Sequence, residues 1–240
     1  MAKHFHSTIL SEIKSRSGTG TTHTLSDTYL GTSHPRYQIT TPVLREIAKS
    51  WAAAHKNLTA SETAHVIESL VTGESSTEKI TGGILLDYVS KAQRDFNPEL
   101  FDGWLDHLEG WAEVDAVCTN KYTVTHILPN FKVWKSLLKQ FNKSKNIHKR
   151  RASLVFLCSP VRHHKDERLL ILALENIERL KSENEILITK AISWLLRSLI
   201  KHFKIEVAAY VKANSDSLPK IAVRETMTML RTGKKTKKPV

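Results

Sequence analysis

The chain has 240 residues, enough for one large domain or one elongated array of repeats, and its hydrophobic content of 40% excludes a largely disordered protein. Only 9 glycines and 7 prolines are present, which disfavours an all-β fold rich in turns. The net charge of +12, of which +7 remains when the last ten residues are left out, indicates a polyanionic partner, most often nucleic acid.

Apolar residues recur at helical spacing along the chain, and no strong strand signal is present. After a first helix, residues 15–27 (SRSGTGTTHTLSD) are expected to form a loop, because they lack the Gly-Lys-Ser/Thr ending of a phosphate-binding loop. Thr41 as a possible cap and Pro42 at the first helical position mark the start of the next helix. Helices are expected over residues 41–55, 59–71, 77–92, 98–110, 130–141, 147–158, 166–180, 183–203, 206–214 and 218–230.

The rhythm of these helices favours an all-α fold built as a helical-repeat array. In such an array, helices of roughly 12–18 residues are joined by short loops, and each pair buries its apolar face on the next. A compact irregular bundle is the alternative, since the sequence repeat itself is weak. We expect a single domain over residues 1–230 and a basic, disordered tail over residues 231–240.

Cysteine content and hydropathy indicate the cellular compartment in which the protein works. Cys118 and Cys158 are too few for a disulfide framework or a four-cysteine zinc site. The N-terminus has no apolar run of signal-peptide length, and no stretch approaches the ~20 apolar residues of a membrane span. We therefore expect a soluble, monomeric protein of the cytoplasm without membrane contact.

The segment GWAEVDAVC (110–118), read as a helix, places Trp111, Asp115 and Cys118 on one face. A buried face would not select aspartate, and a solvated face would not select tryptophan. A lone carboxylate can stabilise a developing positive charge or orient a water molecule. The alternative is a surface aspartate that pairs with a neighbouring basic residue.

Two further segments combine basic residues with apolar helices. In ENEILITKAISWLLRSLIKHF (183–203), a helical projection places Trp194 within roughly 60° of three cations and away from the main apolar face. Such a tryptophan can contact nucleic acid, or it can be half-buried where it packs against a neighbouring helix. These cations are Lys190, Arg197 and Lys201. In NKSKNIHKRRASLVFLC (142–158), five basic residues precede an apolar helix, where backbone N–H groups attract phosphate, although a solvated loop is the simpler interpretation. The five are Lys143, Lys145, Lys149, Arg150 and Arg151.

A third group of polar residues, CSPVRHHKDE (158–167), matches no standard zinc spacing. A solvated loop is the favoured interpretation, and no metal site is expected.

The segments WAEVDAVC (111–118), RRASLVF (150–156) and KAISWLLRSL (190–199) together resemble one family, the alkylpurine DNA glycosylases of the AlkD type. The resemblance spans roughly residues 5–230 and implies a HEAT-like helical-repeat solenoid whose concave face binds DNA. It implies Asp115 as the catalytic aspartate, and Trp111 and Trp194 as tryptophans that contact the deoxyribose. The resemblance also implies Arg151 near the catalytic group. Taken together, the resemblance and the positive charge of these segments indicate further DNA contacts at Tyr29, Arg45, Lys149, Arg150, Lys190, Arg197 and Lys201. The chain departs from the family where an acidic residue often follows the first tryptophan, since Ala112 and then Glu113 stand here.

The implied activity is hydrolysis of the N-glycosidic bond of cationic N3- or N7-alkylated purines in duplex DNA, without base flipping and without a metal or organic cofactor. Such a base leaves as a neutral molecule, so the protein must mainly stabilise positive charge on the sugar, as in glycoside hydrolysis. One rival is a non-catalytic helical-repeat protein that recognises damaged or branched DNA. A second rival is a protein–protein scaffold, which would not need a tryptophan among cations.

Overall fold

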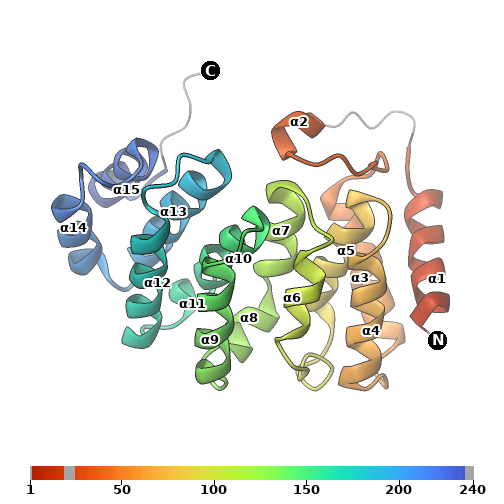
Figure 1. Ribbon diagram of the computed structural model, residues 1–240. Coiled ribbons are helices and arrows are strands. Elements are labelled where there is room, and N and C mark those ends of the chain that lie inside the picture. Colours follow the sequence, from red (N-terminus) through yellow and green to blue (C-terminus); the bar gives the residue numbers. More distant parts are fainter. Residues whose placement is uncertain (1, 19–24, 236–240) are drawn as a thin grey trace. The chain divides into compact units, whose positions relative to one another are not determined.

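The computed structural model describes residues 2–18 and 25–235, which form helices joined by loops, with no strand among them (Figure 1). The prediction of an all-α protein is therefore confirmed. Contacts divide the chain into two compact units, Met1–Tyr122 and Thr123–Val240, here called unit 1 and unit 2. That residues 1–230 form one domain stays a prediction. In the described part of the chain, no helix has the length and apolar character needed to cross a membrane.

Unit 1 is organised around α5, which packs against α3, α4 and α7, while α1 packs against α3 and α4. Thr59 and Ser75 begin α4 and α5 with capping boxes, in which each hydroxyl accepts from the backbone N–H of a glutamate three residues later. The bounds are α1 (Ala2–Ser15), α2 (Asp27–Leu30), α3 (Thr41–Ala54), α4 (Ala60–Val71), α5 (Ser76–Tyr88), α6 (Leu100–Leu105) and α7 (Gly110–Cys118), with α8 (Lys121–His126) continuing into unit 2.

The crossing of α5 and α7 is unusually close at Gly83. A Cβ atom on this residue would lie 2.5 Å from the carbonyl carbon and oxygen of Ala116. Only glycine lets the two backbones approach in this way, so Gly83 sets the position of α7 against the rest of unit 1. This matters because α7 carries Trp111 and Asp115.

Unit 2 is organised around α10 and α13. Neighbouring α10, α13 and α15 pack on one another in that order, while α9 and α12 pack on α10, and α14 packs on α13 and α15. A buried polar link ties three helices together, since Asn142 Nδ2 donates to Ser153 Oγ at 3.0 Å and Asn176 Nδ2 donates to the Ser153 carbonyl at 2.9 Å. The bounds are α9 (Phe131–Asn142), α10 (Ile147–Cys158), α11 (Pro160–His163), α12 (Glu167–Leu180), α13 (Ile186–Leu199), α14 (Lys204–Ala213) and α15 (Lys220–Thr232).

The expected helix boundaries differ from the structure in a few places. Residues 98–110 do not form one helix, because α6 ends at Leu105 and α7 begins at Gly110. The cap of α3 is Thr40 rather than Thr41. Within the predicted loop at 15–27, residues 19–24 lie outside the described residues, as do residues 236–240 of the basic tail.

Candidate active site and nucleic-acid interface

Trp111 and Asp115 lie on the part-exposed side of α7, as their four-residue spacing predicts. The opposite side of the helix is buried and includes Val114, Val117 and Cys118. The aspartate is therefore presented toward the surface beside the tryptophan. The prediction that Cys118 shares a face with Trp111 and Asp115 is wrong, because Cys118 is fully buried and packs in the core.

The orientation of Trp111 is set by α2. Its indole Nε1 donates to the Tyr29 carbonyl at 2.9 Å, and its ring meets the Tyr29 ring edge-on at 5.8 Å between centroids. Ser26 caps α2 and accepts from the Tyr29 backbone N–H. The Tyr29 side chain is 50% exposed. The structure thus brings together two residues, 82 positions apart, for which the resemblance implies DNA contacts.

The first turn of α7 also holds residues 31–34 through two carboxylates for which the sequence pattern predicts no function. Glu109 Oε2 accepts from the backbone N–H and the hydroxyl of Ser33, each at 2.7 Å. Glu113 is fully buried, and it accepts from Thr32 Oγ1 at 2.8 Å and pairs with His34 Nδ1 at 3.1 Å. Glu109 and Glu113, which flank Trp111 in the sequence, therefore hold the segment that carries Tyr29 against α7. We call this set of contacts the clamp.

The charge of Glu113 is balanced inside unit 1. Lys79 is buried on α5, and its Nζ donates to the Val71 carbonyl at 3.1 Å. Burial lowers the pKa of Lys79, although Glu113 and two other glutamates act in the opposite direction. A buried cation and a buried carboxylate thus share the interior behind the exposed face of α7.

The variant Glu113→Gln is expected to lower the free energy of unfolding by about 1–3 kcal/mol, because the amide cannot accept every hydrogen bond that the buried carboxylate accepts. The three donors are Thr32 Oγ1, His34 Nδ1 and the Glu109 backbone N–H, which donates at 2.8 Å. Urea unfolding measures the effect. The control Glu206→Gln replaces an exposed glutamate of α14, where a change within about 0.5 kcal/mol is expected. Equal effects of the two variants would contradict the clamp.

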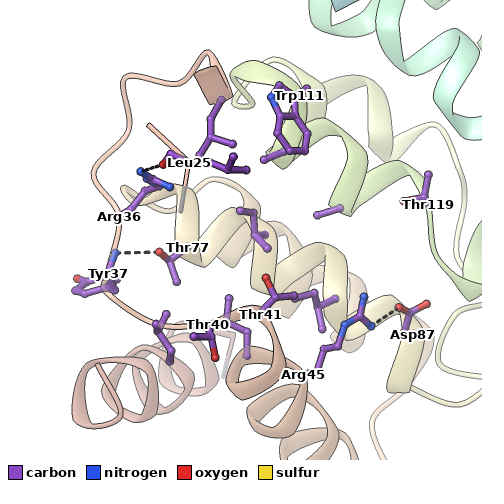
Figure 2. Close-up of a pocket in the computed structure, with 17 residues that line it drawn as sticks. Leu25, Arg36, Tyr37, Thr40, Thr41, Arg45, Thr77, Asp87, Trp111 and Thr119 are labelled. Carbon is purple, nitrogen blue, oxygen red and sulfur yellow. Dashed lines mark hydrogen bonds and ion pairs between the residues drawn. The ribbon is translucent and has the colours of Figure 1, made fainter. Parts of the chain in front are cut away.

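A cavity of about 420 Å³ opens beside Trp111 within unit 1 (Figure 2). Arg45, a predicted DNA contact, lies on its wall and pairs with Asp87 at 3.2 Å. A hydrogen bond with Tyr88, followed by the interaction with Asp87, raises the pKa of Arg45. No local sequence pattern predicts this cavity, because its walls come from segments scattered over residues 25–119.

In unit 2, Trp194, Arg197 and Lys201 border one hollow of about 440 Å³ together with Arg162. Trp194 is half-buried there, and two of the three predicted cations, Arg197 and Lys201, border the same hollow, whereas Lys190 does not. Arg197 pairs with Glu225 of α15 at 3.4 Å. Burial lowers the pKa of Arg197, against the opposing effect of Glu225. Arg197 therefore holds α15 as well as facing the hollow.

The basic start of α10 is partly used to hold unit 2 together. Arg151 is only 4% exposed, and its Nη1 donates to the Leu187 carbonyl at 2.5 Å. Arg150 pairs with Glu183 at 2.9 Å and donates to the carbonyls of the preceding loop. Lys149 and Lys190 are half-buried. Both arginines thus connect α10 to the segment that begins α13.

The histidines of residues 158–167 have structural partners. His164 Nε2 contacts the Val124 carbonyl at 3.0 Å, and Asp166 pairs with Arg168 at 2.7 Å while capping α12. Over residues 2–18 and 25–235, no three His, Cys, Asp or Glu side chains gather as metal ligands.

Fold and site together define a helical-repeat protein in which each unit presents a tryptophan close to cationic side chains. A family model described as "DNA alkylation repair enzyme" matches residues 19–230, so the chain belongs to the family of DNA alkylation repair enzymes. One solved structure, "Predicted DNA alkylation repair enzyme from Enterococcus faecalis", is similar with a TM-score of 0.69 and 19% identity, covering 86% of this chain and 93% of that one. No curated protein matches the chain. The structural likeness confirms the predicted helical-repeat solenoid fold.

Proposed function

We propose that the protein is a monofunctional DNA glycosylase that hydrolyses the N-glycosidic bond of cationic N3- or N7-alkylated purines in duplex DNA, without base flipping. The observation that carries the proposal is the pair formed by Trp111 and Asp115 on the part-exposed side of α7. The indole is fixed by its hydrogen bond to the Tyr29 carbonyl. Membership of the DNA alkylation repair family supports DNA as the substrate.

The chemistry follows from the charge of the lesion. When the glycosidic bond breaks, its electron pair goes to the alkylated purine, which leaves as a neutral base, and positive charge develops on the deoxyribose. The Asp115 carboxylate stabilises that charge and orients a water molecule, whose oxygen bonds to the anomeric carbon as one of its protons passes to the carboxylate and on to solvent. The Trp111 ring favours the cationic nucleoside through its electron-rich face. No general acid is needed for the leaving group.

The remaining residues serve DNA binding in the proposal. In unit 1, Tyr29 and Arg45 contact the sugar–phosphate backbone. In unit 2, Trp194 contacts the DNA, whereas Arg151 is buried and serves binding only indirectly, by holding the start of α13. The further cations hold phosphates and make binding sensitive to salt. They are Lys149, Arg150, Lys190, Arg197 and Lys201. We propose a monomer that acts in the cytoplasm, associated with the nucleoid through DNA.

The first experiment measures release of free 3-methyladenine and 7-methylguanine from methylated duplex DNA, with binding measured on the same duplex between 50 and 200 mM salt. We expect base release, and an affinity that falls about 100-fold or more if four phosphates are contacted. Binding without release would favour a non-catalytic protein that recognises damaged DNA. Absence of both would favour a protein scaffold.

A further inference from the structure

The hollow of about 440 Å³ in unit 2 lies where α11 and α15 both pack on α13. Arg162 is contributed by α11, Trp194 and Ser198 by α13, Lys201 by the turn after α13, and Met229 by α15. The volume lies within the range of roughly 300–1,000 Å³ that is usual for ligand sites. The packing of unit 2 therefore brings a tryptophan, a hydroxyl group and cations from separate helices to one place.

The hollow carries an excess of positive charge. Arg197 also borders it, but its guanidinium pairs with Glu225 at 3.4 Å. Arg162 and Lys201 are exposed, and neither makes an ion pair within residues 2–18 and 25–235. Three cations minus one carboxylate leave a net charge of +2 at the hollow. Two charges that no protein group neutralises favour an anionic ligand.

Ser198 adds a buried hydroxyl group to this wall. The residue is only 4% exposed, and its side chain makes no hydrogen bond to any other residue in the described part of the chain. A buried hydroxyl without a partner is uncommon in folded proteins, because it has lost water without replacing it. A hydroxyl that borders a cationic hollow is placed to donate to an anionic oxygen.

A phosphate group of DNA fits these features together. Its two charged oxygens accept from the Arg162 guanidinium, from Lys201 Nζ and from the Ser198 hydroxyl group. The half-buried Trp194 ring beside them offers an apolar face to the neighbouring sugar. Because the chain belongs to the family of DNA alkylation repair enzymes, DNA is the polyanion that this hollow meets.

We infer that this hollow binds one phosphate group of the DNA backbone, with Arg162, Lys201 and Ser198 as its ligands. The inference rests on the proposed function, because it requires that unit 2 binds duplex DNA. It adds two residues to that function, Arg162 from a short helix and the uncharged Ser198. A phosphate that is held at this point fixes the position of the strand against Trp194.

The test measures the affinity for methylated duplex DNA as a function of salt concentration. The double variant Arg162→Gln/Lys201→Gln is expected to bind more weakly, and the slope of log K against log salt should fall by about 0.9 in magnitude, the value for one phosphate. Glutamine at position 162 keeps the backbone carbonyl that accepts from His202 Nε2 at 3.2 Å. The control Arg179→Gln removes the same charge from an exposed position of α12 and should leave the slope unchanged.

A second variant, Ser198→Ala, separates ligand binding from folding. We expect it to weaken DNA binding roughly tenfold, as for one hydrogen bond to a charged group, and to leave the salt slope unchanged. The melting temperature should stay the same, because the hydroxyl group has no partner within the described residues. A lower melting temperature with unchanged DNA affinity would assign Ser198 a structural role and overturn its part in the site.

Other outcomes divide as follows. A slope that falls by about 1.8 in the double variant would mean two separate phosphates and overturn the single site. Inorganic phosphate is the second probe. If it raises the melting temperature of the wild type but not of Arg162→Gln, while both bind DNA equally, the hollow serves a free anion and the inference falls. If the variants lose DNA affinity as expected but the wild type releases no base, the phosphate site stands and the glycosylase proposal falls. If the wild type releases bases and the double variant matches it in affinity, slope and rate, the inference falls and the glycosylase proposal stands.

Discussion

Replacing Asp115 with asparagine is expected to slow release of alkylated purines from duplex DNA by about 100-fold or more, as for the loss of one group that stabilises transition-state charge. The amide keeps the size of the side chain and the helix, but it carries no negative charge to oppose the charge on the sugar. DNA affinity should be unchanged or higher, because a carboxylate near the backbone repels phosphate. Single-turnover release and binding on the same methylated duplex measure both effects.

The matched control for this variant is Asp216→Asn, which removes the same charge at an exposed turn position of unit 2. It is expected to release bases at the rate of the wild type. If the Asp115→Asn protein retains full activity while it still binds DNA, the role proposed for Asp115 is wrong. Parallel loss of DNA binding and activity would instead point to a role of Asp115 in holding α7.

Replacing Gly110 with alanine is expected to lower the free energy of unfolding by about 3–5 kcal/mol, from a left-handed backbone conformation and from overpacking. Gly110 has φ of +65°, and a Cβ atom there would lie 2.0 Å from the Leu30 carbonyl oxygen. The facing Gly31 also has a positive φ, of +73°. The backbone of the segment that carries Tyr29 must therefore shift away from α7 when alanine is introduced.

Urea unfolding measures the loss of stability, and limited trypsin digestion near Arg36 reports detachment of the segment. The control Gly103→Ala also adds one methyl group, but a Cβ atom at Gly103 meets no atom within 4 Å. Since alanine favours helix over glycine, this control should leave stability unchanged or raise it by up to about 1 kcal/mol. Similar losses in both variants would show that the contact between Gly110 and Leu30 is not what constrains this position.

Local spacing predicted the helices well, because helical periodicity depends on residues three and four apart. The same rule placed Trp111 beside Asp115, and Trp194 beside Arg197 and Lys201, before any tertiary contact was known. The prediction from spacing was wrong at residues 98–110, because the apolar pattern there is continuous although the helix is not. The chain leaves α6 at Leu105, and Gly110, with its positive φ, is the first residue of a new helix.

The sequence by itself thus determined an all-α fold, a basic chain suited to nucleic acid, and the face of α7 that carries Trp111 and Asp115. Only the tertiary structure decided how that face is held and what lies beside it. The clamp joins Glu113 to Thr32 and His34 across about 80 positions, and the cavity is assembled from four separate segments. Arg151 appeared in the sequence as a surface cation, whereas folding buries its guanidinium against the Leu187 carbonyl. Such contacts depend on how helices pack, and a one-dimensional pattern of apolar residues records which side of a helix is buried but not which partner covers it.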